Sequence, residues 1–278
     1  MLLLALDTST SAITAALLDV SDSPGDSGVS GDSGVSGDSR NSRVADASRA
    51  PWVRRRIDVR GHAEWLSSQI VELLAQAGRR AGEVTHVVAG EGPGPFTGLR
   101  VGLVTAETFA FATGARYAGV CSLDALAFAA VREGAVGGDG GVGREGGSDG
   151  AREFLVATDA RRKEVYWALY VLDEGQAVPR RVSDPAVAKP ADLPERVRAL
   201  PCVGRGATLY PELLPNAAGP LDVDAGELAR LAELLLREGR LEMRERAQPL
   251  YLRRPDAVPS VPTVQPASGA PAAAGAEA

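Results

Sequence analysis

Residues 90–102 read GEGPGPFTGLRVG, and this is the most informative stretch of the chain. An apolar run at 84–89 precedes it and a small-residue apolar segment at 97–113 follows it, which predicts a strand, a stiff loop and a helix. Pro93 and Pro95 carry no N–H group, so the loop lacks the consecutive backbone donors of a phosphate cradle. It also lacks the lysine of a Walker loop and the glycine spacing of a dinucleotide fingerprint. The loop therefore favours a helix presented for docking.

The composition excludes several classes of protein. The chain has 278 residues, 45% of them hydrophobic, and a net charge of −6, which argues against nucleic-acid binding through bulk charge. Cys121 and Cys202 lack CxxC spacing, which argues against a disulfide framework or a zinc site. No apolar run approaches about 20 residues, and the N-terminus lacks the features of a signal peptide. We therefore expect a cytoplasmic protein without a membrane span.

The order of apolar segments predicts an α/β fold. Short apolar or β-branched runs predict strands at residues 2–6, 13–18, 52–59, 85–89, 117–120, 154–159 and 164–171, and a short strand with a tight Gly-x-Gly turn at 202–207. Helical spacing predicts helices at 63–77, 97–113, 123–131 and 226–238, with Ser122 as the N-cap of the third.

Two insertions and a tail interrupt this pattern. The hexapeptide GDSGVS occurs twice in succession within residues 21–50, and 133–150 are rich in glycine. Such segments bury too little apolar surface to offset their ordering entropy. We therefore expect an N-terminal half at 1–113 with a disordered insertion, a C-terminal half at 114–255 with a Gly-rich insertion, and a disordered tail at 256–278.

Several motifs taken together resemble the TsaB (YeaZ) family. They are DTST at residues 7–10, the block at 90–102, DARRKEVY at 159–166, RGHAE at 60–64, VGRGA at 203–207 and PLYLR at 249–253. The resemblance covers most of residues 1–255 outside the insertions. It implies a duplicated actin-like (ASKHA, RNase H-like) α/β fold with two mixed-sheet halves.

The resemblance also implies a function. Members of this family are non-catalytic subunits of the bacterial machinery that forms threonylcarbamoyladenosine in tRNA. They pair with and activate a TsaD-type catalytic subunit as a heterodimer, a TsaE-type ATPase joins the pair, and tRNA is reached through the complex. A family member alone can self-associate through the same surface as a homodimer.

The residues themselves predict no catalytic or metal site. The TsaD-type subunit binds a metal through an HxxxH pair after the strand that follows its second helix, and the matching residues 119–126 hold no histidine. The chain has only His62 and His86, whereas a metal site needs several converging ligands. We expect no cofactor on the isolated chain, with ATP or ADP and Mg²⁺ only at the complex interface.

A vestigial nucleotide cleft is the second expectation from the resemblance. Asp7 and Asp159 form either a working acid–base or Mg²⁺ pair, or merely cap turns. The glycines at 204 and 206 either mark an old adenosine pocket or make a tight turn. The predicted cleft residues are Asp7, Thr8, Ser9, Asp159, Gly204 and Gly206.

The helix at 97–113 carries small residues every fourth position, and they pack either on a partner helix or on the chain's own sheet. The stripe is Gly98, Gly102, Ala106 and Ala110. By position, the resemblance implies a partner interface at His62, Trp65, Leu66, Gln69, Leu73, Thr97, Arg100, Val101 and Val104. Reversing the charge of Arg100, or the change Leu73→Asp, is predicted to abolish partner binding and leave the fold intact.

Two competing functions rest on fewer residues. An actin-like small-molecule kinase would use the turn at 7–10, Asp159 and the segment 204–206 to hold MgATP, and nucleotide binding by the isolated chain distinguishes it. A peptidase would need a nucleophile–base pair or a metal-ligand set, and the sequence shows neither, nor a GxSxG elbow.

Overall fold

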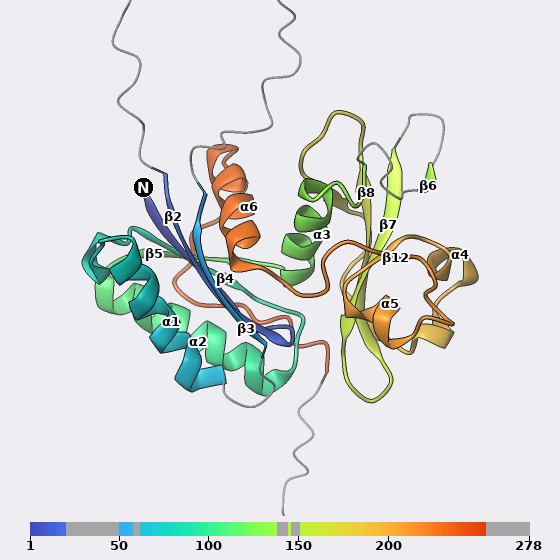
Figure 1. Cartoon of the computed structure of the whole chain (residues 1–278), viewed down its shortest axis with the longest axis horizontal. Helices are drawn as coiled ribbons and strands as arrows, with labels where there is room; N and C mark the ends of the chain where they lie inside the picture. Colours follow the sequence, from blue (N-terminus) through green and yellow to red (C-terminus); the bar gives the residue numbers. More distant parts are fainter. Residues whose placement is uncertain (21–49, 58–61, 138–143, 146–150, 254–278) are drawn as a thin grey trace, which may run out of the picture.

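The computed structural model describes residues 1–20, 50–57, 62–137, 144–145 and 151–253, with no side chains described at 62–64 and 144–145. The predicted α/β class is confirmed, since two mixed sheets pack with helices (Figure 1). The predicted insertion at 21–50, apart from residue 50, and the predicted tail at 256–278 lie outside the described residues. No helix in the described part of the chain is long and apolar enough to cross a membrane.

The first sheet has five strands in the order β3-β2-β1-β4-β5. β1 pairs antiparallel with β2 and parallel with β4, and β4 pairs parallel with β5. Every residue of β1 is buried, as expected for a strand that helices cover on both faces. The strands are β1 (Leu2–Asp7), β2 (Ala12–Asp19), β3 (Trp52–Ile57), β4 (His86–Gly90) and β5 (Arg116–Val120).

Two pairs of helices cover the two faces of this sheet (Figure 1). α1 (His62–Gln76) and α2 (Phe96–Thr113) share one core with Leu4 of β1. α3 (Ser122–Arg132) and α6 (Ala225–Arg237) share the other core with Leu3. Adjacent strand residues thus point into opposite cores, because side chains alternate along a strand.

The second sheet has seven strands, with a central path β10-β8-β7-β11-β12 to which β6 and β9 add at β7 and β8. Its inner face packs on α3, so that α3 and α6 lie between the two sheets (Figure 1). The remaining elements are β6 (Arg144–Glu145), β7 (Arg152–Asp159), β8 (Val165–Leu172), β9 (Arg180–Arg181), β10 (Ala186–Ala188), β11 (Cys202–Val203), β12 (Ala217–Ala218), α4 (Glu195–Arg198) and α5 (Arg205–Leu209), with short 3₁₀ turns at Ala81–Glu83 and Pro190–Asp192.

Four local predictions need correction. Ser122 does not cap α3, because its hydroxyl accepts from the N–H of Gly92 and donates to Asp7 instead. Residues 202–207 form a two-residue strand and the start of α5 rather than one strand. Part of the predicted insertion at 133–150 is core, because Val136 is fully buried. A boundary at 113/114 would separate β5 from the sheet that contains it.

A C-terminal strap, residues 241–253, follows α6 and pairs with the edge strand β5 through Arg244 and Tyr117. It is anchored on the buried carboxylate of Glu91, which accepts from Arg244 Nη1 at 2.9 Å and from the backbone N–H of Gln248 at 2.6 Å. Tyr117 donates to the same carboxylate at 3.3 Å. Burial raises the pKa of Glu91 above its ordinary value, against the opposing hydrogen bonds and the charge of Arg244. The strap ends beside the β7–β8 turn.

Candidate functional site

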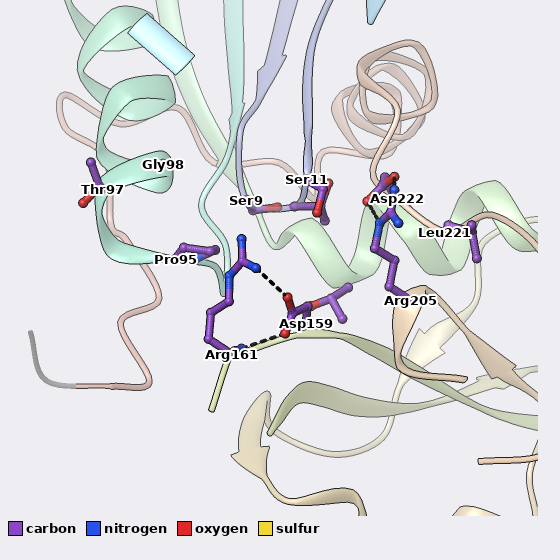
Figure 2. Close-up of a pocket in the computed structure, with 12 residues that line it drawn as sticks. Ser9, Ser11, Pro95, Thr97, Gly98, Asp159, Arg161, Arg205, Leu221 and Asp222 are labelled. Carbon is purple, nitrogen blue, oxygen red and sulfur yellow. Dashed lines mark hydrogen bonds and ion pairs between the residues drawn. The ribbon is translucent and has the colours of Figure 1, made fainter. Parts of the chain in front are cut away.

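A small cleft lies between the two halves, where the turn after β1 meets the start of α2 and the end of β7 (Figure 2). The cavity measures about 180 Å³. The polar residues around it include Ser9, Thr97, Asp159, Arg161, Arg205 and Asp222.

Asp7 lies beneath this cleft and is closed off by its own partners. Its carboxylate accepts from the backbone and side chain of Ser9, both at 2.8 Å, and from the hydroxyl of Ser122 at 2.6 Å. Burial raises the pKa of Asp7 above its ordinary value, although these hydrogen bonds oppose the rise. A carboxylate whose oxygens are already bonded within a buried network suits a structural role, as in the turn-capping alternative.

The raised pKa of Asp7 predicts how the variant Asp7→Asn responds to pH. The folded chain holds this proton more tightly than the unfolded chain, so ionisation costs the wild type stability as the pH rises above about 4. Asparagine does not ionise. The free energy of unfolding of the variant minus that of the wild type, measured in urea titrations, should therefore increase from pH ~4 to pH ~8. A value for the variant minus the wild type that stays constant or falls as the pH rises would contradict the assignment.

Asp222 is the carboxylate that joins the two halves. Arg205 of α5 binds it through two nitrogens at 2.7 Å each, and Arg55 of β3 approaches it at 3.2 Å (Figure 2 shows the Arg205 pair). The side chain of Asp222 is fully buried, so a bidentate guanidinium is what makes its charge tolerable. The negative charge of Asp222 also acts on Asp7, whereas no contact joins Asp7 to Asp159 among those described.

The β7–β8 turn, residues 160–164, has an unusual backbone. Arg161, Arg162 and Lys163 have φ values of 61°, 52° and 62°, the left-handed region that favours glycine. The N–H of Arg161 donates to the Asp159 carboxylate at 2.7 Å, and Glu164 N–H closes the turn on the Arg161 carbonyl at 2.9 Å. The guanidinium of Arg161 also pairs with Asp159 at 3.3 Å (Figure 2).

This backbone predicts that Lys163→Gly stabilises the fold. Glycine removes the steric cost of the left-handed conformation, and the net gain is about 0.5 to 1 kcal/mol after the larger entropy of an unfolded glycine is subtracted. The matched control is Lys189→Gly, because Lys189 has an ordinary φ of −71°. Chemical denaturation should show a gain for the first variant and a loss for the second. Equal losses in both would refute this account of the turn.

The described residues do not fit a bound Mg²⁺–nucleotide. Asp159 and Asp222 are both engaged by arginines, and Asp7 is bonded to two serines. Among the residues that the structure describes, no group of three or more histidine, cysteine, aspartate or glutamate side chains could hold a metal ion. The cavity is also smaller than the roughly 300 Å³ or more of typical ligand pockets.

The glycines at 204 and 206 serve packing. Gly204 has a φ of 98°, and a Cβ there would lie 2.4 Å from the carbonyl oxygen of Ala157. A Cβ on Gly206 would lie 2.7 Å from the Ala157 methyl group. These contacts favour the tight-turn alternative over an adenosine pocket.

The small-residue stripe of α2 faces the chain's own β1–β2 turn and sheet. Thr8 Oγ1 donates to the Gly98 carbonyl at 2.8 Å and accepts from the Gly102 N–H at 3.1 Å. A Cβ on Gly102 would lie 2.3 Å from that hydroxyl oxygen. Ala106 and Ala110 are buried in the same core. The stripe is therefore an internal contact. Of the two alternatives, packing on the chain's own sheet holds and packing on a partner helix does not.

The opposite sides of α1 and α2 form the outer helical face, which points away from the sheet (Figure 1). We define this face by the exposed residues Val71, Thr97, Arg100, Val104 and Phe111. Three of them are large apolar side chains, with exposed fractions of 66% for Val71, 54% for Val104 and 92% for Phe111. Such a set on adjacent helices is typical of a protein–protein contact.

The predicted interface residues divide between this face and the core. Thr97, Arg100 and Val104 are exposed, and Val101 is half-buried. Trp65 is half-buried beneath the guanidinium of Arg56, which lies 3.4 Å from its ring centroid. The side chain of His62 lies outside the described residues.

Leu66, Gln69 and Leu73 were wrongly assigned to the interface. All three are buried, because the apolar stripe of α1 faces the sheet and not a partner. The prediction that Leu73→Asp leaves the fold intact is therefore wrong, since it would place a charge in the core. Val71, which lies off the main stripe of α1 with Trp65, is exposed but was not included in the predicted interface.

Comparison with known proteins identifies the family. The family model described as TsaD, tRNA N6-adenosine threonylcarbamoyltransferase, matches residues 56–208. An uncharacterised protein of Mycobacterium tuberculosis is 36% identical over 211 residues, which span 73% of this chain and 80% of that protein. The chain belongs to the TsaD family. Within it the chain is of the TsaB (YeaZ) type, as two further comparisons show.

The TsaB-type assignment rests on sequence and structure together. The tRNA threonylcarbamoyladenosine biosynthesis protein TsaB of Escherichia coli is 29% identical over 204 residues, covering 70% of this chain and 81% of that protein. The solved structure of YeaZ from Pseudomonas aeruginosa superposes with a TM-score of 0.63 at 29% identity, covering 90% of this chain and 99% of that one. The fold of the TsaB-type chain is thus duplicated and actin-like, as predicted. Membership connects it to tRNA threonylcarbamoyladenosine biosynthesis.

Proposed function

We propose that this chain is a non-catalytic assembly subunit in the formation of tRNA threonylcarbamoyladenosine, and that it pairs with and activates a TsaD-type catalytic subunit. The observation that carries the proposal is the outer helical face, where Val71, Val104 and Phe111 expose apolar surface on two adjacent helices. Buried apolar anchors supply most of the free energy in protein interfaces. A cytoplasmic location follows from tRNA as the substrate of the complex.

The cleft supports a structural role for this chain rather than a catalytic one. Each of its carboxylates is engaged by a neighbouring arginine or hydroxyl group, so none is available as a general base. The described residues likewise offer no fit for MgATP, which counts against the alternative of a small-molecule kinase. In this proposal ATP or ADP and Mg²⁺ act in the complex, through the TsaD-type subunit and a TsaE-type ATPase.

Self-association through the same face is the related alternative for the isolated chain. An exposed apolar face can pair with a second copy when its partner is absent, and the two states would compete for one surface. Adding the TsaD-type subunit should therefore convert any homodimer into a heterodimer. A homodimer that persists beside bound partner would show that the two interfaces differ.

The experiment is reconstitution with and without this chain. The TsaD-type subunit and TsaE-type ATPase of the same organism are combined with tRNA, ATP and a preformed activated threonylcarbamoyl donor, and the modified adenosine is quantified. We expect a stable complex and a loss of modification when the chain is omitted. Full modification without the chain would overturn the proposal, and MgATP turnover by the chain alone would replace it with the kinase.

A further inference from the structure

The C-terminal strap runs beside α2 on the side away from α1. In the first sheet, α1 packs on β2 and β3, whereas α2 packs on β4 and β5. The strap bridges to the outer edge of β5 between Arg244 and Tyr117, and Ala247 then packs in the core that α1 and α2 share. The elements on this side of the sheet therefore follow one another in the order α1, α2 and strap.

Two contacts tie the strap to the same side of α2 that carries the outer helical face. The N–H of Ala247 donates to Oε1 of Glu107 at 2.5 Å, and the ring of Tyr251 packs on Phe96 with centroids 5.0 Å apart. With 3.6 residues per turn, an arc of about 80° on α2 holds both of these α2 residues and three residues of the outer helical face. The residues in this arc are Phe96, Arg100, Val104, Glu107 and Phe111. The strap therefore forms the border of the outer helical face.

The strap holds Tyr251 in a fixed place. Before it in the chain, the Leu250 N–H donates to the Glu91 carbonyl at 2.8 Å. After it, Nη1 of Arg253 donates to the Ala160 carbonyl at 3.0 Å. A side chain on a backbone that is fixed at both ends gives up little conformational entropy when a partner covers it.

The aromatic pair of Tyr251 and Phe96 has the composition of an interface anchor. Both rings are exposed in part, and the guanidinium of Arg100 lies 5.2 Å from the Phe96 ring centroid. Aromatic rings and arginine are enriched at the centres of protein interfaces. The pair adjoins Thr97 and Arg100, so its exposed surface continues the outer helical face.

An open hollow lies at the other end of the strap, against the last turn of α2. It measures about 570 Å³ and is lined by residues of α2, β5 and the strap. Ala110 and Tyr117, which line it, are buried, whereas Phe111, which also lines it, is exposed. Met243 lines it from the strap, and a methionine adapts its shape to an incoming side chain. The hollow can therefore receive an apolar side chain from a partner on the outer helical face.

We propose that the strap is the third element of the docking surface, beside α1 and α2. Tyr251 and Phe96 contact the TsaD-type subunit as one aromatic anchor, and an apolar side chain of that subunit enters the hollow. This inference rests on the proposed function, because it takes the TsaD-type subunit as the partner. The same partner is expected on the strap because the arc of α2 that a docked subunit would cover is the arc to which the strap is bonded.

Photo-crosslinking to the purified TsaD-type subunit tests these contacts directly. The photoreactive residue p-benzoylphenylalanine replaces Tyr251, Glu245 at the hollow, or Val104 on the outer helical face, each in the full chain. The control position is Leu209, an exposed apolar residue of α5. We expect adducts from positions 104, 245 and 251 and none from 209. An adduct from 104 with none from 251 would overturn the proposal, and an adduct from 251 with none from 245 would overturn the use of the hollow.

Affinity measurements test whether Tyr251 contributes to binding. Tyr251→Ala should lower the affinity for the TsaD-type subunit about tenfold in titration calorimetry, because it removes an aromatic anchor. Tyr251→Phe keeps the ring and should bind as the wild type does, and so should the control Leu209→Ala. A loss of affinity in Tyr251→Ala without an adduct from position 251 would mean that the ring only holds the strap in place, and would also overturn the proposal.

A failure of the proposed function gives a different result. In that case the wild-type chain forms no complex with the TsaD-type subunit, and position 104 gives no adduct. A failure of this inference alone leaves complex formation and the adduct from position 104 intact.

Discussion

Val104→Asp is expected to weaken binding to the TsaD-type subunit strongly while leaving this chain folded. Val104 lies in the middle of the outer helical face and is exposed, so a carboxylate there is hydrated in the free chain. In a complex the same charge would be desolvated without a partner, at a cost of about 3 kcal/mol or more, which lowers the affinity by roughly a hundredfold. Titration calorimetry measures the loss, and circular dichroism checks the fold.

Leu209→Asp is the matched control for this variant. Leu209 is likewise a half-exposed apolar residue on a helix, in α5 of the second half, away from the outer helical face. It should bind the partner as the wild type does. Val71→Asp on α1 should repeat the loss seen at Val104. If Val104→Asp and Val71→Asp both bind the partner with wild-type affinity, α1 and α2 do not form the interface.

Gly90→Ala is expected to be among the most destabilising single changes in this chain. A Cβ at this position would lie 1.7 Å from Asp7 Oδ2 and 2.6 Å from Ser122 Oγ, and both neighbours are buried. Neither can withdraw, because they are hydrogen-bonded to each other. Overpacking at such a site should cost about 3 kcal/mol or more of unfolding free energy, measured by urea denaturation.

A double-mutant cycle identifies the cause of that loss. If the clash with Asp7 is responsible, Asp7→Ala should recover part of the stability in the Gly90→Ala background, with a coupling of about 1 kcal/mol or more. Gly82→Ala is the control, because no atom lies within 4 Å of the added Cβ and its φ is ordinary. That change should be near neutral. Additive losses at residues 7 and 90 would contradict the packing account.

Most of the fold could be predicted from residue periodicity. The strands at 2–6 and 13–18 and the helix at 226–238 agree with the structure to within one or two residues, because each is a continuous apolar run or a strong amphipathic pattern. Ser122 shows the limit of local pattern. A serine at the start of a helix is a typical N-cap. Here, however, the hydroxyl of Ser122 hydrogen-bonds to Asp7 and to the N–H of Gly92, which are distant in the sequence.

The candidate site was harder to predict, for reasons of long-range contact. The stripe on α2 meets Thr8, which lies 94 residues before Gly102 in the chain, so sequence spacing alone left its partner open. Asp222 stands in no motif, and only the fold brings it to Arg205 and Arg55. The left-handed turn at 161–163 holds no glycine or asparagine, the residues that normally signal that conformation.

Carrying interface positions over from a family also could not predict which side chains of α1 are buried in the core and which lie on the surface. The resemblance placed Leu66 and Leu73 at the interface, whereas both pack on the sheet. An amphipathic helix that covers a sheet turns its main apolar stripe inward, and a partner then contacts what remains outside. Val71, a large apolar residue that is exposed on α1, is the signal that helical periodicity offers for the outer side.

Hydroxyl-radical footprinting of this chain, alone and with the TsaD-type subunit, tests directly whether the outer helical face is the docking surface. Phe111 is the most informative probe, because it is a reactive aromatic side chain that is 92% exposed. If a partner docks on this face, the oxidation rates of Phe111 and Val104 fall in the complex while that of Leu209 does not change. Unchanged oxidation of Phe111 and Val104, with protection of Leu209 instead, would contradict it.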